Sequence, residues 1–177
     1  MNILKSIITK SKLTTDDYHN LDHNGFIIIE KSNYMLKNFL KLKKKSADLI
    51  KQEKDKGGWE GKEEYFKKGK KFESGADRLG GLVSKGKEFL GLIKIPEILD
   101  AAQHVTKSEI KICGLNLRNP TKNLGNQSIH IDGFARNNPN DEYAGIVAFI
   151  FLDDTKIENG AMRIIPKSHK KLGWPDD

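Results

Sequence analysis

The sequence has little cysteine and no long hydrophobic run, and each absence narrows the class of protein. The single cysteine, Cys113, excludes an internal disulfide and is typical of a reducing compartment. Because Cys113 lies in an apolar run, we expect a buried structural thiol there rather than a nucleophile. No apolar run approaches the roughly 20 residues of a membrane-spanning helix, and lysines interrupt the N-terminus too often for a signal-peptide core. We therefore expect a soluble, cytoplasmic protein with no membrane partner.

Arginine is also scarce, although the formal net charge is +7. Among 31 basic residues there are only four arginines: Arg78, Arg118, Arg136 and Arg163. Recognition of phosphates and bases depends heavily on the planar guanidinium group of arginine. We therefore interpret the lysines as a solvated surface and expect no nucleic-acid partner. A basic module that binds nucleic acid or acidic partners is kept as an alternative function.

The chain has the length of one domain, and its helix signals are clear. With 177 residues, 37% of them hydrophobic, it can bury a core. Residues 1–13 show no strong pattern and are interpreted as a loosely attached leader that need not be ordered; residues 14–177 are interpreted as one domain. Capping signals and apolar stripes predict three helices: Thr14 to Gly25, Tyr34 to about Lys56, and Pro96 to about Val105.

Strand signals are concentrated in the second half of the chain. The stretch from Gly57 to about Gly86 is rich in glycine and lysine without a sustained period, which predicts a long loop. Apolar runs and alternating patterns predict strands at Phe26–Ile29, Glu109–Arg118, Ala144–Leu152 and Ala161–Ile165, the third of them fully buried. Helices followed by strands predict an α+β fold.

The stretch from Gly125 to Gly133 carries the chemistry. It holds His130 and Asp132 two residues apart, and on a strand this spacing places both side chains on one face. An imidazole and a carboxylate that converge with one further histidine form the facial triad of non-haem Fe(II) oxygenases. Taken alone, the His-x-Asp spacing is also what a surface pair would show.

An ordered set of motifs surrounds this stretch. They are Gln127-x-x-His130-x-Asp132, Leu152-Asp153-Asp154, Asn159-Gly160 and Pro166-x-Ser168-His169. Together they strongly resemble the phytanoyl-CoA dioxygenase family, over about residues 14–172. The resemblance implies an Fe(II)- and 2-oxoglutarate-dependent dioxygenase that uses O₂ to hydroxylate a small organic substrate. It also implies a double-stranded β-helix of the jelly-roll or cupin-like type, with N-terminal helices packed on the sheet.

The resemblance implies roles only at matched positions. His130 and Asp132 match the first two iron ligands, and the carboxylate of Asp132 favours hydroxylation over halogenation. Four further positions are implied near the 2-oxoglutarate co-substrate: Phe149, Leu115, Arg78 and Gln127. For Phe149 and Leu115 a plain core role is the alternative, for Arg78 a surface arginine, and Gln127 is interpreted as an outer neighbour of the iron ligands.

The resemblance also implies two parts for which the sequence has no candidate. These are a third, downstream histidine ligand and an arginine that binds the far carboxylate of 2-oxoglutarate. His169 is the only later histidine, and it lies in a motif where the family does not use it as a ligand. We therefore expect a fragment whose β-helix lacks its C-terminal strands and that is inactive alone; a degenerate, non-catalytic relative is the second explanation. The sequence does not indicate the oligomeric state.

Overall fold

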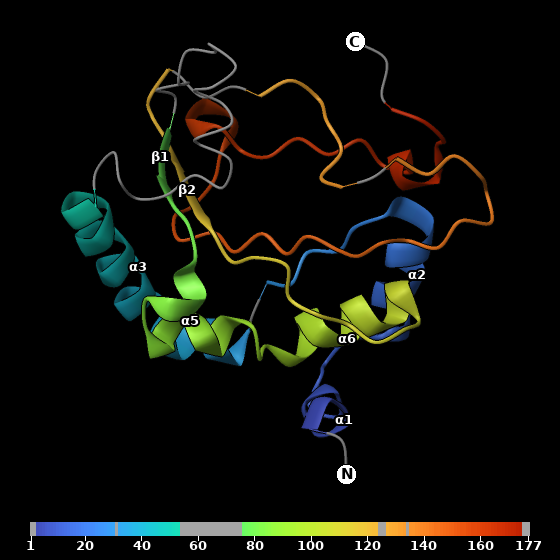
Figure 1. The fold of residues 1–177 in the computed structure, drawn as a ribbon, viewed down its shortest axis with the longest axis horizontal. Coiled ribbons are helices and arrows are strands. Elements are labelled where there is room, and N and C mark those ends of the chain that lie inside the picture. Colours follow the sequence, from blue (N-terminus) through green and yellow to red (C-terminus); the bar gives the residue numbers. More distant parts are fainter. Residues whose placement is uncertain (1–2, 31, 54–75, 124–126, 134, 175–177) are drawn as a thin grey trace.

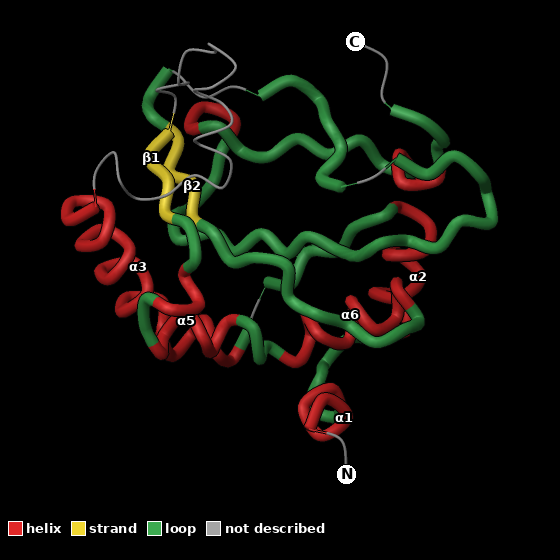
Figure 2. The backbone as a smooth tube through the Cα atoms, viewed as in Figure 1, coloured by secondary structure: helices red, strands yellow, loops and turns green. Residues whose placement is uncertain are grey.

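Helices form one side of the molecule and long extended segments cross the other (Figures 1 and 2). The structure is a computed structural model that describes residues 3–30, 32–53, 76–123, 127–133 and 135–174. Its elements, in chain order, are α1 (Ile3–Ile8), α2 (Thr15–Asn24), α3 (Asn33–Glu53), β1 (Ala76–Leu79), η2 (Leu82–Ser84), α5 (Lys87–Leu92), α6 (Pro96–Thr106), β2 (Leu117–Pro120), η3 (Ile157–Asn159) and η4 (Ser168–Lys170).

The predicted caps of α2 are present at both of its ends. The Thr14 hydroxyl accepts a hydrogen bond from the Asp17 N–H, and the Asp17 carboxylate accepts one from the Thr14 N–H at 2.8 Å. This reciprocal pair satisfies two N–H groups that have no partner within the helix. Gly25 ends the helix in the left-handed region with φ of 88°, which glycine adopts at little cost.

The other two predicted helices are also present. α6 begins at Pro96, whose missing N–H costs nothing in the first turn. α3 begins one residue before the predicted start, and the predicted end near Lys56 lies outside the described residues. α6 packs on both α1 and α2, so that these three helices form one group.

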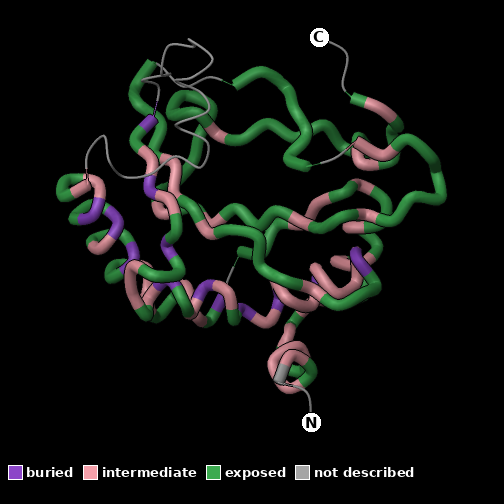
Figure 3. Tube along the Cα trace, in the orientation of Figure 1, coloured by how far each residue is buried: buried purple, intermediate pink, exposed green. Residues whose placement is uncertain are grey.

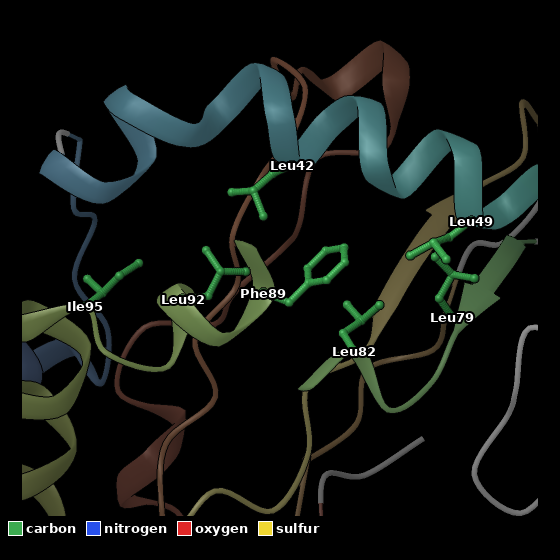
Figure 4. Close-up of a cluster of buried hydrophobic side chains, with 7 residues drawn as sticks. All are labelled: Leu42, Leu49, Leu79, Leu82, Phe89, Leu92 and Ile95. Atoms are coloured by element: carbon green, nitrogen blue, oxygen red, sulfur yellow. The ribbon is translucent and has the colours of Figure 1, made fainter. Parts of the chain in front are cut away.

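The hydrophobic core lies between α3, α5 and the small sheet (Figure 4). It is built from seven buried side chains: Leu42, Leu49, Leu79, Leu82, Phe89, Leu92 and Ile95. Leu42 and Leu49 are seven residues apart and therefore share one face of α3. Phe89 and Leu42 are almost completely enclosed, and burial of each such side chain contributes about 1.5–3 kcal/mol.

The sheet consists of β1 and β2, which pair antiparallel with Arg78 opposite Arg118. β1 corrects the loop predicted from Gly57 to Gly86, of which residues 57–75 lie outside the described residues. The pairing partner of β1 is about 40 residues away in sequence, so a local pattern could not reveal it. In place of the strand predicted over 109–118, only Leu117–Pro120 is paired, and Cys113 is exposed rather than buried.

Three further strand predictions are wrong. The described residues 26–29, 144–152 and 161–165 run without strand pairing, and most of 144–152 is exposed rather than buried (Figure 3). An extended segment becomes a strand only when a neighbour accepts its backbone hydrogen bonds, and alternation in the sequence does not supply that neighbour.

Within 144–152 the side chains nevertheless alternate. Ile150 and Leu152 pack against the core, whereas Val147, Phe149 and Phe151 are 53%, 54% and 49% exposed. The segment therefore has one face on the helical core and one open apolar face. An ion pair between Lys43 of α3 and Asp153 holds the end of this segment on α3.

The described residues thus form a mostly helical α+β structure with one two-stranded antiparallel sheet. The double-stranded β-helix that the family resemblance implied is not seen in them. Across the described part of the chain, none of the helices combines the length and apolar character needed to span a bilayer.

Candidate metal centre

His130 and Asp132 lie beside each other, although not on a strand. The described residues 127–133 form an irregular segment with bends at Ile129 and at Asp132–Gly133. Nε2 of His130 lies 3.4 Å from Oδ1 of Asp132, and the two side chains are 49% and 51% exposed. The predicted proximity is therefore present, while the predicted reason for it, the shared face of a strand, is wrong.

A backbone carbonyl fixes the tautomer of His130. Nδ1 of His130 lies 2.7 Å from the carbonyl oxygen of Ser128, and a carbonyl oxygen can only accept. Nδ1 therefore carries the hydrogen and donates it, which leaves the lone pair of a neutral imidazole on Nε2. Nε2 is the atom that faces Asp132.

This arrangement suits a bound cation. A bare Nε2 lone pair and a carboxylate oxygen are both acceptors, so neither can satisfy the other without a proton or a metal ion between them. Two ligand atoms about 2.1 Å from a metal ion and at right angles to each other are roughly 3 Å apart. The observed 3.4 Å is close to that separation. A histidine that donates its other N–H to a carbonyl is also the usual orientation of a metal ligand.

The other four histidines gather around α2 instead. His19 and His23 lie on α2, where their rings stack with centroids 5.7 Å apart, and Nε2 of His104 lies 2.9 Å from the carboxylate of Asp22. His169 also reaches this helix, because its Nε2 lies 3.3 Å from the Asp22 carbonyl oxygen. Within the described residues no three side chains of histidine, cysteine, aspartate or glutamate form a group that could hold a metal ion.

The residues predicted near the co-substrate are dispersed over several elements. Leu115 packs against the core, and its carbonyl accepts a hydrogen bond from the Leu82 N–H at 2.9 Å. Phe149 is on the open face of 144–152, Arg78 is on β1, and Gln127 is exposed three residues before His130. The core alternative fits Leu115, and the co-substrate roles of all four residues stay predictions.

The structure adds one contributor that the sequence could not indicate. The Ser128 carbonyl orients His130, and every residue carries a carbonyl, so no residue type marks this role. Only the bend of the chain at 129–133 brings the carbonyl and the ring together.

Comparison with known proteins agrees with the family resemblance of the motifs. The family model of phytanoyl-CoA dioxygenase (PhyH) matches residues 21–176, which is most of the chain. The chain therefore belongs to the phytanoyl-CoA dioxygenase family, as its motifs indicated. No curated protein and no solved structure matches the chain. Enzymes of this family are dioxygenases that depend on 2-oxoglutarate and typically use Fe(II).

Proposed function

We propose that the chain carries part of the active site of an Fe(II)- and 2-oxoglutarate-dependent dioxygenase that hydroxylates a small organic substrate. The observation that carries the proposal is the pair His130 and Asp132, with the lone pair of Nε2 facing a carboxylate oxygen in a member of this family. The proposed complete fold is the double-stranded β-helix. We also propose a cytoplasmic location, because one cysteine fits a reducing compartment.

His130 and Asp132 would hold two positions of the metal ion through Nε2 and Oδ1. With 2-oxoglutarate and O₂, bound iron supplies oxidative decarboxylation to succinate and CO₂, coupled to hydroxylation of a C–H bond. The Ser128 carbonyl keeps a hydrogen on Nδ1, so in the neutral ring Nε2 is the nitrogen that offers its lone pair to a metal ion. The carboxylate of Asp132 adds a negative charge, which favours a divalent cation over a neutral ligand.

The same observations support a site that is incomplete in this chain. All five histidines are described, and four of them are committed to the surroundings of α2. Two protein ligands in a half-exposed site give weaker metal binding than a facial triad. We therefore propose that these 177 residues alone bind Fe(II) weakly and do not turn over 2-oxoglutarate.

Anaerobic titration of the chain with Fe(II), followed by calorimetry, tests the metal site. We expect weak binding that His130→Ala or Asp132→Ala abolishes. His19→Ala is the matched control, because it removes one imidazole of the stacked His19–His23 pair, to which a metal ion could bind adventitiously. Binding that survives His130→Ala and disappears in His19→Ala would contradict the proposed centre.

Succinate formation in air tests the second part of the proposal. With Fe(II) and 2-oxoglutarate we expect no succinate above the level of the His130→Ala variant. Clear, His130-dependent succinate formation would show that the site is complete and would remove the claim of inactivity. If Fe(II) does not bind and a polyanion binds with an affinity that falls steeply with salt, the basic binding module replaces the dioxygenase.

A further inference from the structure

A small pocket of about 180 Å³ lies where the start of α2, the start of α6 and the segment after α2 meet. It includes none of the residues of the candidate metal centre. Its polar lining comes from Asp17, Glu30, Glu97 and Lys12. Among the described residues of the lining, three carboxylates stand against one ammonium group, a local excess of negative charge in a chain whose net charge is +7. A concave site with this local charge concentrates cations.

Glu97 is the decisive residue of this pocket. It lies in the first turn of α6, is only 6% exposed and lines the pocket. Within the described part of the chain its carboxylate makes no hydrogen bond or ion pair. The oxygens of this carboxylate are not enclosed, since they are not among the buried polar atoms that lack a partner, and they are open to the pocket. The pocket therefore presents an unpaired negative charge that a cation from solvent can reach.

The other charged side chains of the lining also bear on the binding of a cation. The Asp17 carboxylate accepts hydrogen bonds from the N–H and the hydroxyl of Thr14, which hold its pKa below its ordinary value. Asp17 is therefore ionised near neutral pH and adds negative potential to the pocket. Among the described residues of the lining, Lys12 is the only cation, so its ammonium group is an internal competitor for Glu97.

The remaining wall is apolar. Leu13, Ile28 and Ile29 complete the lining, and Ile28 is 78% exposed. An aliphatic group would cover this wall and gain the free energy of removing it from water. A pocket of 180 Å³ holds the volume of about six water molecules, which corresponds to a ligand of about that many heavy atoms.

We propose that this pocket binds a small primary alkylammonium ion, with its ammonium group on Glu97 and its aliphatic part against Leu13, Ile28 and Ile29. A divalent metal ion fits less well, because the described residues contain no group of three side chains that could hold one and because an apolar wall offers a metal ion nothing. The ammonium group donates to Glu97, and no covalent step is involved.

Titration of the full chain with n-butylammonium chloride at neutral pH, followed by ¹H–¹⁵N NMR, tests the proposal. We expect saturable shifts in the first turns of α2 and α6, and no comparable shifts with n-butanol. Glu97→Gln keeps the size of the side chain and is expected to weaken binding about tenfold or more, because it removes a charged hydrogen bond. Lys12→Ala is expected to strengthen binding, because it removes the internal competitor.

Glu88→Gln is the matched control, since Glu88 also lies in the first turn of a helix but outside the pocket. Its affinity for n-butylammonium is expected to equal that of the unchanged chain. Glu30→Gln provides a second, exposed variant in case Glu97→Gln does not fold. Equal binding by Glu97→Gln and the unchanged chain, equal shifts with n-butanol, or saturable binding of Ca²⁺ in place of the amine would overturn the assignment.

Discussion

Gly25 offers a direct test of how the C-terminal turn η4 packs against α2. A methyl group added at Gly25 would lie 2.3 Å from Nδ1 of His169, far inside contact distance. The same ring donates from Nε2 to the Asp22 carbonyl, and the Lys167 N–H donates to the Asn24 carbonyl at 2.8 Å. η4 thus satisfies carbonyl groups that α2 leaves without helical partners. We expect Gly25→Ala to destabilise the protein by displacing this contact.

The magnitude can be separated into two parts. Gly25 has φ of 88°, and a residue with a side chain pays about 1–2 kcal/mol in this left-handed region. Overpacking against the His169 ring adds about 1–3 kcal/mol. Gly160 has the same φ of 88°, but a methyl group there meets no atom within 4 Å. Gly160→Ala therefore measures the backbone part alone, and Gly25→Ala should cost about 1–3 kcal/mol more.

Urea unfolding monitored by circular dichroism is the appropriate assay, with His169→Ala and the double variant Gly25→Ala/His169→Ala completing a cycle. Once the ring is absent, Gly25→Ala should cost no more than Gly160→Ala. The reasoning fails if Gly25→Ala and Gly160→Ala lower the free energy of unfolding equally, or if the cycle shows no coupling. Either result would mean that His169 does not pack on Gly25 in solution.

Three further predictions concern single side chains. Phe89→Ala should lower the free energy of unfolding in urea by about 3–5 kcal/mol, because it opens a cavity in the core. Thr14→Ala should raise the pKa of Asp17 toward its ordinary value in an NMR titration, and should abolish the part of the stability that is lost as pH falls through the depressed pKa. The pKa of His23 is lowered chiefly by the nearby Lys167 charge, so Lys167→Ala should raise it; an unchanged His23 titration would show that η4 is not beside α2.

The helices α2, α3 and α6 could be predicted because their signals are local, whereas the six-residue helices α1 and α5 were not predicted. Thr14 and Asp17 are three residues apart, Gly25 directly follows the last residue of α2, and Pro96 begins α6. Each of these residues acts through its own backbone or through the adjacent turn. The sequence alone therefore contains the information that places these ends.

The strands could not be predicted equally well, because a strand depends on a distant partner. Ala76–Leu79 has no strong strand pattern, yet it pairs with Leu117–Pro120. The apolar segment 144–152 has a strong pattern, yet it is unpaired in the described structure. Propensity reports how well side chains suit a pleated surface, whereas pairing decides whether such a surface forms.

Only part of the candidate site could be predicted from the sequence. The spacing of His130 and Asp132 indicated that the two side chains could meet, and they lie 3.4 Å apart. The hydrogen bond that orients the ring goes to a backbone carbonyl, and no side chain in the sequence reports it. Their role as metal ligands stays a prediction, and the surroundings of the four other histidines could be seen only in three dimensions.

The open face of residues 144–152 tests whether this chain by itself closes a second sheet over that face, as a complete β-helix would. Phe149 is 54% exposed, so Phe149→Ala should lose only part of the burial free energy and create no cavity, a cost of about 1 kcal/mol. Phe89→Ala in the enclosed core provides the reference. If a second sheet covers this face in solution, Phe149 becomes a core residue and its loss should approach that of Phe89. Parallel urea unfolding of the two variants therefore measures whether this face is covered, and a small Phe149 effect would refute a closed β-helix for this chain.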